Sequence, residues 1–164
     1  MKIAGILLLF AAAGLAGFLK AAGLHRRTLE LDGLIQLVGR IHSEIRYFRT
    51  PALELVQRLT GLHEFEKYRV IAAFHERLAH APDLAAAWAE TPASQLTDDD
   101  RLVVDEFVAA FGKTDLAGQR DVCAGTADRL RRQREEAAAA CGAKARLYRS
   151  LGLLGGALIA VVLI

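Results

Sequence analysis

The stretch LDGLIQLVGRIHSEIRYF, residues 31–48, decides how the rest of the chain folds. Its apolar residues recur in alternating steps of three and four, which places them on one face of an α-helix. They are Leu31, Leu34, Val38, Ile41, Ile45 and Phe48. A seam this narrow is typical of a helix in a core or a coiled coil, and less often of a surface kept for a partner. We predict that this helix is the central packing element of a helical domain.

An uncharged apolar run, Ile3 to Leu19, precedes this helix. With about seventeen residues it reaches the lower limit for crossing a hydrocarbon core of roughly 30 Å. A secretory signal peptide, cleaved near Ala13 or Ala16, is the alternative. The apolar run continues beyond those sites, however, and a basic collar follows it, which favours an uncleaved span with the downstream chain in the cytoplasm. The collar consists of Lys20, His25, Arg26 and Arg27.

The chain also ends in an uncharged apolar segment, residues 150–164. As a helix this segment is only about 22 Å long, so spanning requires help from Leu147 and Tyr148 or local thinning of the bilayer. Basic residues again lie on the domain side: Lys144, Arg146 and Arg149. Both ends therefore predict one topology in the cell membrane: an N-terminal transmembrane segment (1–22), a cytoplasmic helical domain (23–149) and a C-terminal transmembrane segment (150–164).

The residues between the two apolar ends predict an all-α fold. Hydrophobic residues make up 53% of the chain, which has only three prolines and is rich in Ala, Leu and Arg. We expect a helix opening at Pro51, a helix over 65–78, a short helix capped by Asp83, a helix with a capping box at Thr97, and a long helix from Leu116 into the C-terminal segment. The predicted architecture is an antiparallel bundle of about five to six helices flanked by N- and C-terminal transmembrane helices.

The charge balance speaks against nucleic-acid binding. The net charge is +2, and beyond Lys20 the nineteen Lys and Arg residues equal the nineteen Asp and Glu residues in number. Nucleic-acid binding generally requires a one-sided basic surface. We therefore expect protein and lipid partners, with neither a nucleic acid nor a small-molecule substrate.

None of the candidate chemical motifs has the spacing that its chemistry requires. Gly112-Lys113-Thr114 lacks the upstream glycine and the preceding strand of a phosphate-binding loop. His75 and His80 are five residues apart and diverge on a helix, so they do not form a zinc site. Cys123 and Cys141, if both lie on the long helix, are about 27 Å apart, beyond the roughly 7 Å limit for a disulfide. We expect a non-enzymatic protein without a catalytic site, cofactor or metal.

A cluster of arginines is the most pronounced local charge feature: Arg129, Arg131, Arg132 and Arg134. It is a solvated helix face if Arg131 and Arg132 pair with Glu135 and Glu136, four residues further on. The alternative is a contact with an acidic partner or anionic lipid. Glu44 and Arg46, in the stretch 31–48, are further candidates for partner binding.

Several short motifs resemble the stage III sporulation protein AB family, in order and spacing, over nearly the whole chain. They are Gly17-Phe18, Leu24-His25-Arg26-Arg27, Ser43-Glu44-Ile45, Thr50-Pro51, Phe111-Gly112-Lys113-Thr114-Asp115 with Gln119, and Leu147-Tyr148-Arg149-Ser150-Leu151-Gly152. His42 departs from the family pattern, in which we expect a second acidic residue.

The resemblance implies a non-enzymatic membrane scaffold of the secretion-like sporulation channel between mother cell and forespore. It implies a helical domain similar to the platform domains of type II secretion, on the cytoplasmic side of the mother-cell membrane that faces the forespore. The implied partners are other channel subunits, membrane lipid and a secretion-type ATPase, stage III sporulation protein AA. The alternative is an exported helical binding protein with a cleaved signal peptide and a C-terminal membrane tail.

Overall fold

The computed structural model describes residues 25–45, 51–93 and 95–163, with side chains up to residue 143. Within this part every regular element is helical, which confirms the predicted all-α class. Residues 25–44 form one helix, called the stem helix below. It is followed by α2 (Ala52–Thr60), the 3₁₀-helix η1 (His63–Phe65), α3 (Arg69–Leu78), α4 (Leu84–Ala89), α5 (Asp98–Ala110) and α6 (Leu116–Leu163).

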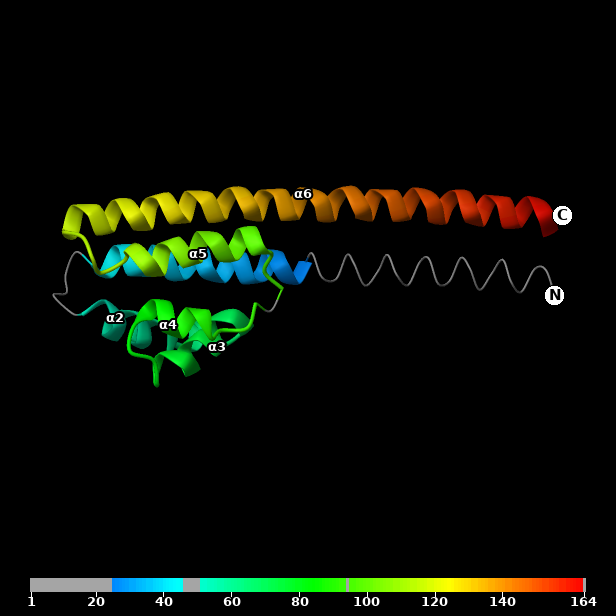
Figure 1. Cartoon of the computed structure of the whole chain (residues 1–164). Helices are drawn as coiled ribbons and strands as arrows, with labels where there is room; N and C mark the ends of the chain where they lie inside the picture. Colours follow the sequence, from blue (N-terminus) through cyan, green and yellow to red (C-terminus); the bar gives the residue numbers. More distant parts are fainter. Residues whose placement is uncertain (1–24, 46–50, 94, 164) are drawn as a thin grey trace.

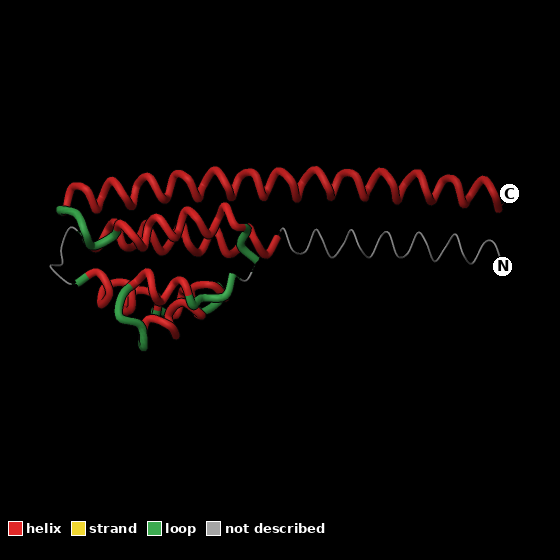
Figure 2. The backbone as a smooth tube through the Cα atoms, viewed as in Figure 1, coloured by secondary structure: helices red, strands yellow, loops and turns green. Residues whose placement is uncertain are grey.

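The helices form two layers (Figures 1 and 2). The stem helix, α5 and α6 lie side by side in one layer, and α2, α3 and α4 pack together as the other. The stem helix and α5 run in the same direction, whereas α6 runs against both. The bundle is therefore mixed, and the prediction of a wholly antiparallel arrangement is wrong. The difference arises because the three short helices return the chain to the starting end of the stem helix before α5 begins.

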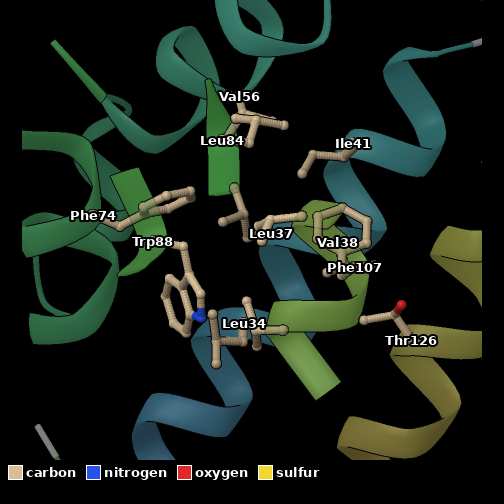
Figure 3. Close-up of a pocket in the computed structure, with 12 residues that line it drawn as sticks. Leu34, Leu37, Val38, Ile41, Val56, Phe74, Leu84, Trp88, Phe107 and Thr126 are labelled. Atoms are coloured by element: carbon tan, nitrogen blue, oxygen red, sulfur yellow. The ribbon is translucent and has the colours of Figure 1, made fainter. Parts of the chain in front are cut away.

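The predicted stripe of the stem helix forms the centre of the core. Its members from Leu31 to Ile45 are all buried, and Leu31 and Ile41 are 0% exposed; Phe48 lies outside the described residues. The core surrounds a cavity of about 20 Å³ (Figure 3), where Leu34, Leu37 and Ile41 of the stem helix meet side chains from every other α-helix. They are Val56, Phe74, Leu84, Trp88, Phe107 and Thr126. The stripe is thus covered within the chain.

Gly33 brings the two layers into direct contact. The ring of Tyr68 lies on the stem backbone at this residue, so that a Cβ added at Gly33 would be 2.5 Å from Tyr68 Cγ. Tyr68 itself is 2% exposed. Because real Cβ atoms do not approach other atoms this closely, the absence of a side chain at Gly33 permits the packing.

Two of the predicted helix starts are confirmed by their hydrogen bonds. The Asp83 carboxylate accepts a bond of 2.8 Å from the backbone N–H of Ala86, which caps α4. At α5 the Thr97 hydroxyl accepts from the backbone N–H of Asp100, while the Asp100 carboxylate accepts from that of Thr97. These bonds satisfy N–H groups that have no partner within the helix.

The prediction of one helix over 65–78 is wrong. The chain forms η1, turns, and begins α3 only at Arg69. The reason is Glu30, a carboxylate of the stem helix that is 3% exposed and accepts bonds of 3.1 Å from the backbone N–H groups of both Arg69 and Val70. A side chain distant in sequence thus caps α3, and local periodicity does not reveal it.

Helix α6 continues far beyond the bundle (Figure 1). Ala137 is the last buried residue whose side chain is described, and α6 reaches Leu163, about 39 Å further along the helix axis. Across the residues that the structure describes, no helix combines the length and hydrophobicity that crossing a bilayer requires. The segment at 1–22 lies outside the described residues, and both transmembrane segments remain predictions.

Candidate partner-binding surfaces

Two arginines of the α6 cluster join α6 to its neighbours. Arg129 pairs with Glu106 of α5. Arg134 donates to both carboxylate oxygens of Asp32 on the stem helix, at 3.0 and 3.5 Å. Both pairs are partly exposed, and such pairs contribute up to about 1 kcal/mol each. These two side chains therefore hold helices of the same chain together.

The other two arginines face solvent. Arg131 is bonded to Asp128, one turn back on α6, at 2.6 Å. The expected partner is Glu135, four residues further on. Asp128, three residues back, is an equally close neighbour on the helix and is the partner in the structure. Arg132 is exposed and makes no ion pair within the described part of the chain. Of the four candidates, Arg132 is thus the cation available to a partner.

Glu44 links the stem helix to α2. It accepts a bond of 3.0 Å from Arg58, and Arg40 lies 4.0 Å from its other oxygen. A partner at Glu44 would have to compete with both arginines. Arg46, the second candidate on this stretch, lies outside the described residues.

Arg27 of the basic collar is part of the bundle. Its guanidinium donates to both oxygens of Asp100 at 2.7 and 2.9 Å, and Asp100 is completely buried. Burial by itself raises the pKa of Asp100, but the hydrogen bonds from Arg27 and Thr97 outweigh it and lower the pKa of this carboxyl. Hydrogen bonding to Asp100 in turn raises the pKa of Arg27. The positive charge of Arg27 is therefore neutralised inside the protein.

The other collar residues differ in how far the structure describes them. Arg26, beside Arg27, is exposed. Lys20 lies outside the described residues. Lys144, Arg146 and Arg149 belong to α6, but their side chains are outside the described part. Their predicted role in membrane topology stays a prediction.

An open groove lies between α2, α4 and the end of α5, and we call it the distal groove. The end of α5 lies at the end of the bundle opposite to the projecting part of α6 (Figure 1). The volume of the groove is about 180 Å³. The first turns of α2 and α4 form its walls together with the end of α5 and the turn that follows α5. Its apolar residues include Leu53, Leu84, Val108 and Phe111, and its ionisable residues are Asp83 and Lys113.

Gly112 shapes one side of the distal groove. Its φ angle is +84°, a conformation that L side chains rarely adopt, and it directly follows Phe111, the C-cap residue of α5. A Cβ at this position would lie 2.7 Å from Cβ of Ala52 on α2. Gly112 and Lys113 thus belong to the turn that ends α5. This turn follows a helix, whereas a phosphate-binding loop follows a strand.

The described residues offer few groups that could hold a metal or act as a nucleophile. They contain no group of three or more His, Cys, Asp or Glu side chains placed to hold a metal ion. Cys123 is fully buried, and burial raises the pKa of its thiol to about 12, so it carries no thiolate at neutral pH. The distal groove itself is mainly apolar, with charges only on individual lining residues.

Sequence reasoning did not identify the distal groove. Its residues come from three separate helices and a turn, so no spacing along the chain brings them together. The one available signal is the segment Phe111-Gly112-Lys113, which is part of the family resemblance and lines the groove.

These features define a small helical bundle with a long projecting helix and a groove at its far end. The chain belongs to the stage III sporulation protein AB family, whose model matches residues 2–164. Comparison with curated proteins and with solved structures gave no match.

Proposed function

We propose that this protein is a non-enzymatic scaffold subunit of the secretion-like sporulation channel between mother cell and forespore. In this proposal residues 1–22 and 150–164 anchor it in the mother-cell membrane that faces the forespore, and the bundle lies on the cytoplasmic side. There it couples stage III sporulation protein AA, a secretion-type ATPase, to the other channel subunits. Membership in the stage III sporulation protein AB family supports the sporulation role.

The single structural observation that carries the proposal is the projection of α6. The helix continues about 39 Å beyond Ala137, its last buried residue among those whose side chains are described. The segment at its end is uncharged from Ser150 onward. Insertion into a bilayer would give these apolar side chains a suitable environment.

Labelling of single cysteines in intact sporulating cells tests the topology. In a C123A/C141A background, Glu76→Cys places a thiol on the exposed face of α3. We expect a membrane-impermeant maleimide to label it only after the mother-cell membrane has been opened. Labelling in unopened cells would contradict the proposal. The intact mass of the mature protein then distinguishes the proposal from the alternative of an exported protein, because cleavage of a signal peptide would remove roughly the first sixteen residues.

Binding of the ATPase to the full-length protein in lipid nanodiscs tests the coupling. The distal groove is the surface we assign to it, because it faces away from the anchored end. Ala85→Arg fills the groove from an exposed lining position, whereas Ala109→Arg adds the same side chain to the exposed face of α5. We expect A85R to weaken binding at least tenfold and A109R to leave it unchanged. Equal binding of the two variants would exclude the groove.

A further inference from the structure

The stem helix and α6 run antiparallel and contact each other along most of the described stem helix. In its first half, Asp32 accepts hydrogen bonds of 3.0 and 3.5 Å from Arg134 of α6. Toward its end, His42 lines an open pocket together with Ala117 and Ala124 of α6. These contacts fix which side of α6 faces the stem helix, and they fix the register of the two helices to within about one turn.

Helix α6 extends past the point where the described part of the stem helix begins. His25 is seven residues before Asp32, and its antiparallel counterpart on α6, seven residues after Arg134, is Cys141. From Cys141 the helix continues unbroken to Leu163, which is about 33 Å further along its axis. The side of α6 that faces the stem helix therefore continues beyond the described contact.

The chain itself supplies a segment that can cover this side of α6. Residues 1–24 join the stem helix at His25, contain no proline, and have Lys2 and Lys20 as their only charged residues. Ala and Leu, two strong helix formers, are their commonest residues. As a helix this segment is about 36 Å long, so it can run alongside α6 as far as Leu163.

Helical periodicity identifies the residues at which the two segments meet. Eighteen residues make five turns of an α-helix, so residues eighteen positions apart lie on the same side. Gly152 is eighteen positions after Arg134, and Gly14 is eighteen positions before Asp32. Two glycines opposite each other allow the helix backbones to approach closely, as is typical of helix pairs in membranes.

We propose that residues 1–24 extend the stem helix and pack antiparallel along α6, with Gly14 opposite Gly152 to within about one turn. Continuity with the existing contact favours this segment over a second copy of the chain. Residues 1–24 are connected to a helix that already lies beside α6, and this connection gives them a high effective concentration. The inference goes beyond the proposed function, which anchors both ends of the chain but does not require them to touch.

Disulfide formation between engineered cysteines tests this pairing in the full-length protein, in membranes from sporulating cells. Gly14→Cys is combined with a second cysteine on α6 in the C123A/C141A background. The facing series places the second cysteine one turn apart on the stem-facing side: Y148C, G152C or G156C. The control series places it between these positions on the opposite side: S150C or L154C.

The expected result follows from the geometry of a disulfide, which requires Cα atoms within roughly 7 Å. We expect at least one variant of the facing series to oxidise within single chains at least fivefold faster than either control. A second facing pair, Leu7→Cys with Ile159→Cys, leaves both glycines unchanged and lies about seven turns from the bond between Asp32 and Arg134. Trp88 fluorescence of the purified variants shows whether the bundle is folded.

Three outcomes would overturn the inference: equal rates in the facing and control series, disulfides only between two chains, or no disulfide in the facing series and in the second pair. The topology labelling described above decides the proposed function separately. Labelling in unopened cells would refute that function without changing the disulfide result. The expected topology without a facing disulfide would refute this inference alone.

Discussion

Arg27→Met separates the two roles that a collar arginine can have. The variant keeps the length and the apolar part of the side chain but leaves the fully buried Asp100 without its guanidinium partner. If Arg27 served only as a positive charge beside the membrane, the stability of the bundle would be unaffected. Because its charge is paired with Asp100, we expect a large loss of stability instead.

The size of that loss follows from the burial of the pair. Removing one partner of a buried ion pair costs about 3–5 kcal/mol, mainly because the other charge stays buried and unpaired. The Arg27 side chain is 18% exposed, so water can reach part of the site, and the Thr97 backbone N–H still donates to Asp100. We therefore expect about 3 kcal/mol, the lower end of the range. A domain of this size has roughly 5–15 kcal/mol in total.

Equilibrium unfolding of the full-length protein in mild detergent measures this loss. Trp88 is the single tryptophan and is 1% exposed, so its fluorescence reports on the core. Arg26→Met is the matched control, since Arg26 is the exposed neighbour of Arg27. We expect R26M to change the unfolding free energy by less than about 0.5 kcal/mol. Equal effects of R26M and R27M would refute the assignment.

The pairing of Arg27 with Asp100 also predicts how stability changes with pH. The folded pKa of Asp100 is lowered, and its pKa in the unfolded chain is about 3.9. A lowered carboxyl pKa stabilises the fold above the unfolded value, and this contribution is lost as the pH falls through the folded value. The gap between wild type and R27M depends on the folded pKa of Asp100 in each protein, because the unfolded contribution cancels, and burial without the guanidinium raises that pKa in R27M. The gap should therefore narrow as the pH falls from the raised pKa in R27M to the lowered pKa in wild type. A gap that widens on acidification would contradict the pairing.

Three further predictions concern packing and capping. Gly33→Ala should destabilise the protein by about 1–3 kcal/mol in the same unfolding assay, whereas Gly39→Ala, with nothing within 4 Å of an added Cβ, should stabilise it by up to about 1 kcal/mol. Cys123 should react with a thiol reagent only after unfolding, because it is buried and its pKa is raised to about 12; reaction in the native protein would contradict its burial. Glu30→Gln should lower the free energy of unfolding by about 1–2 kcal/mol, because it weakens the cap of α3. Hydrogen exchange should show a greater loss of amide protection in α3 than in the other helices, and a smaller loss in α3 would contradict the prediction.

The sequence predicts those parts of the fold that depend on local chemistry. The stem stripe, the Asp83 cap and the Thr97 capping box each rely on residues within a few positions of one another, and the structure confirms all three. The long α6 follows in the same way from an uninterrupted helical composition between Leu116 and the C-terminal segment.

What the sequence does not predict depends on contacts between distant residues. Glu30 determines where α3 begins through bonds that span about forty positions, and Arg27 reaches Asp100 across more than seventy. The parallel course of the stem helix and α5 follows from how three short helices return the chain, which no single helix encodes. For the same reason the distal groove could not be predicted, although one of its walls, Phe111-Gly112-Lys113, was singled out as part of the family resemblance.

The two ends of the bundle are therefore built differently, and the difference suits the scaffold that we propose, which would connect a membrane to a partner. Near the end from which α6 projects, the buried pair of Arg27 and Asp100 fixes the stem helix to α5, and Arg134 fixes it to α6 through Asp32. Charged bonds between parallel rods resist sliding, because a shift of one turn would leave Asp100 buried without its partner. At the opposite end α2, α4 and the end of α5 line a mainly apolar groove of about 180 Å³. If α6 is anchored as we propose, a force applied at the groove would move the stem helix, α5 and α6 as one unit. The force would then be transmitted to the membrane with little deformation of the bundle.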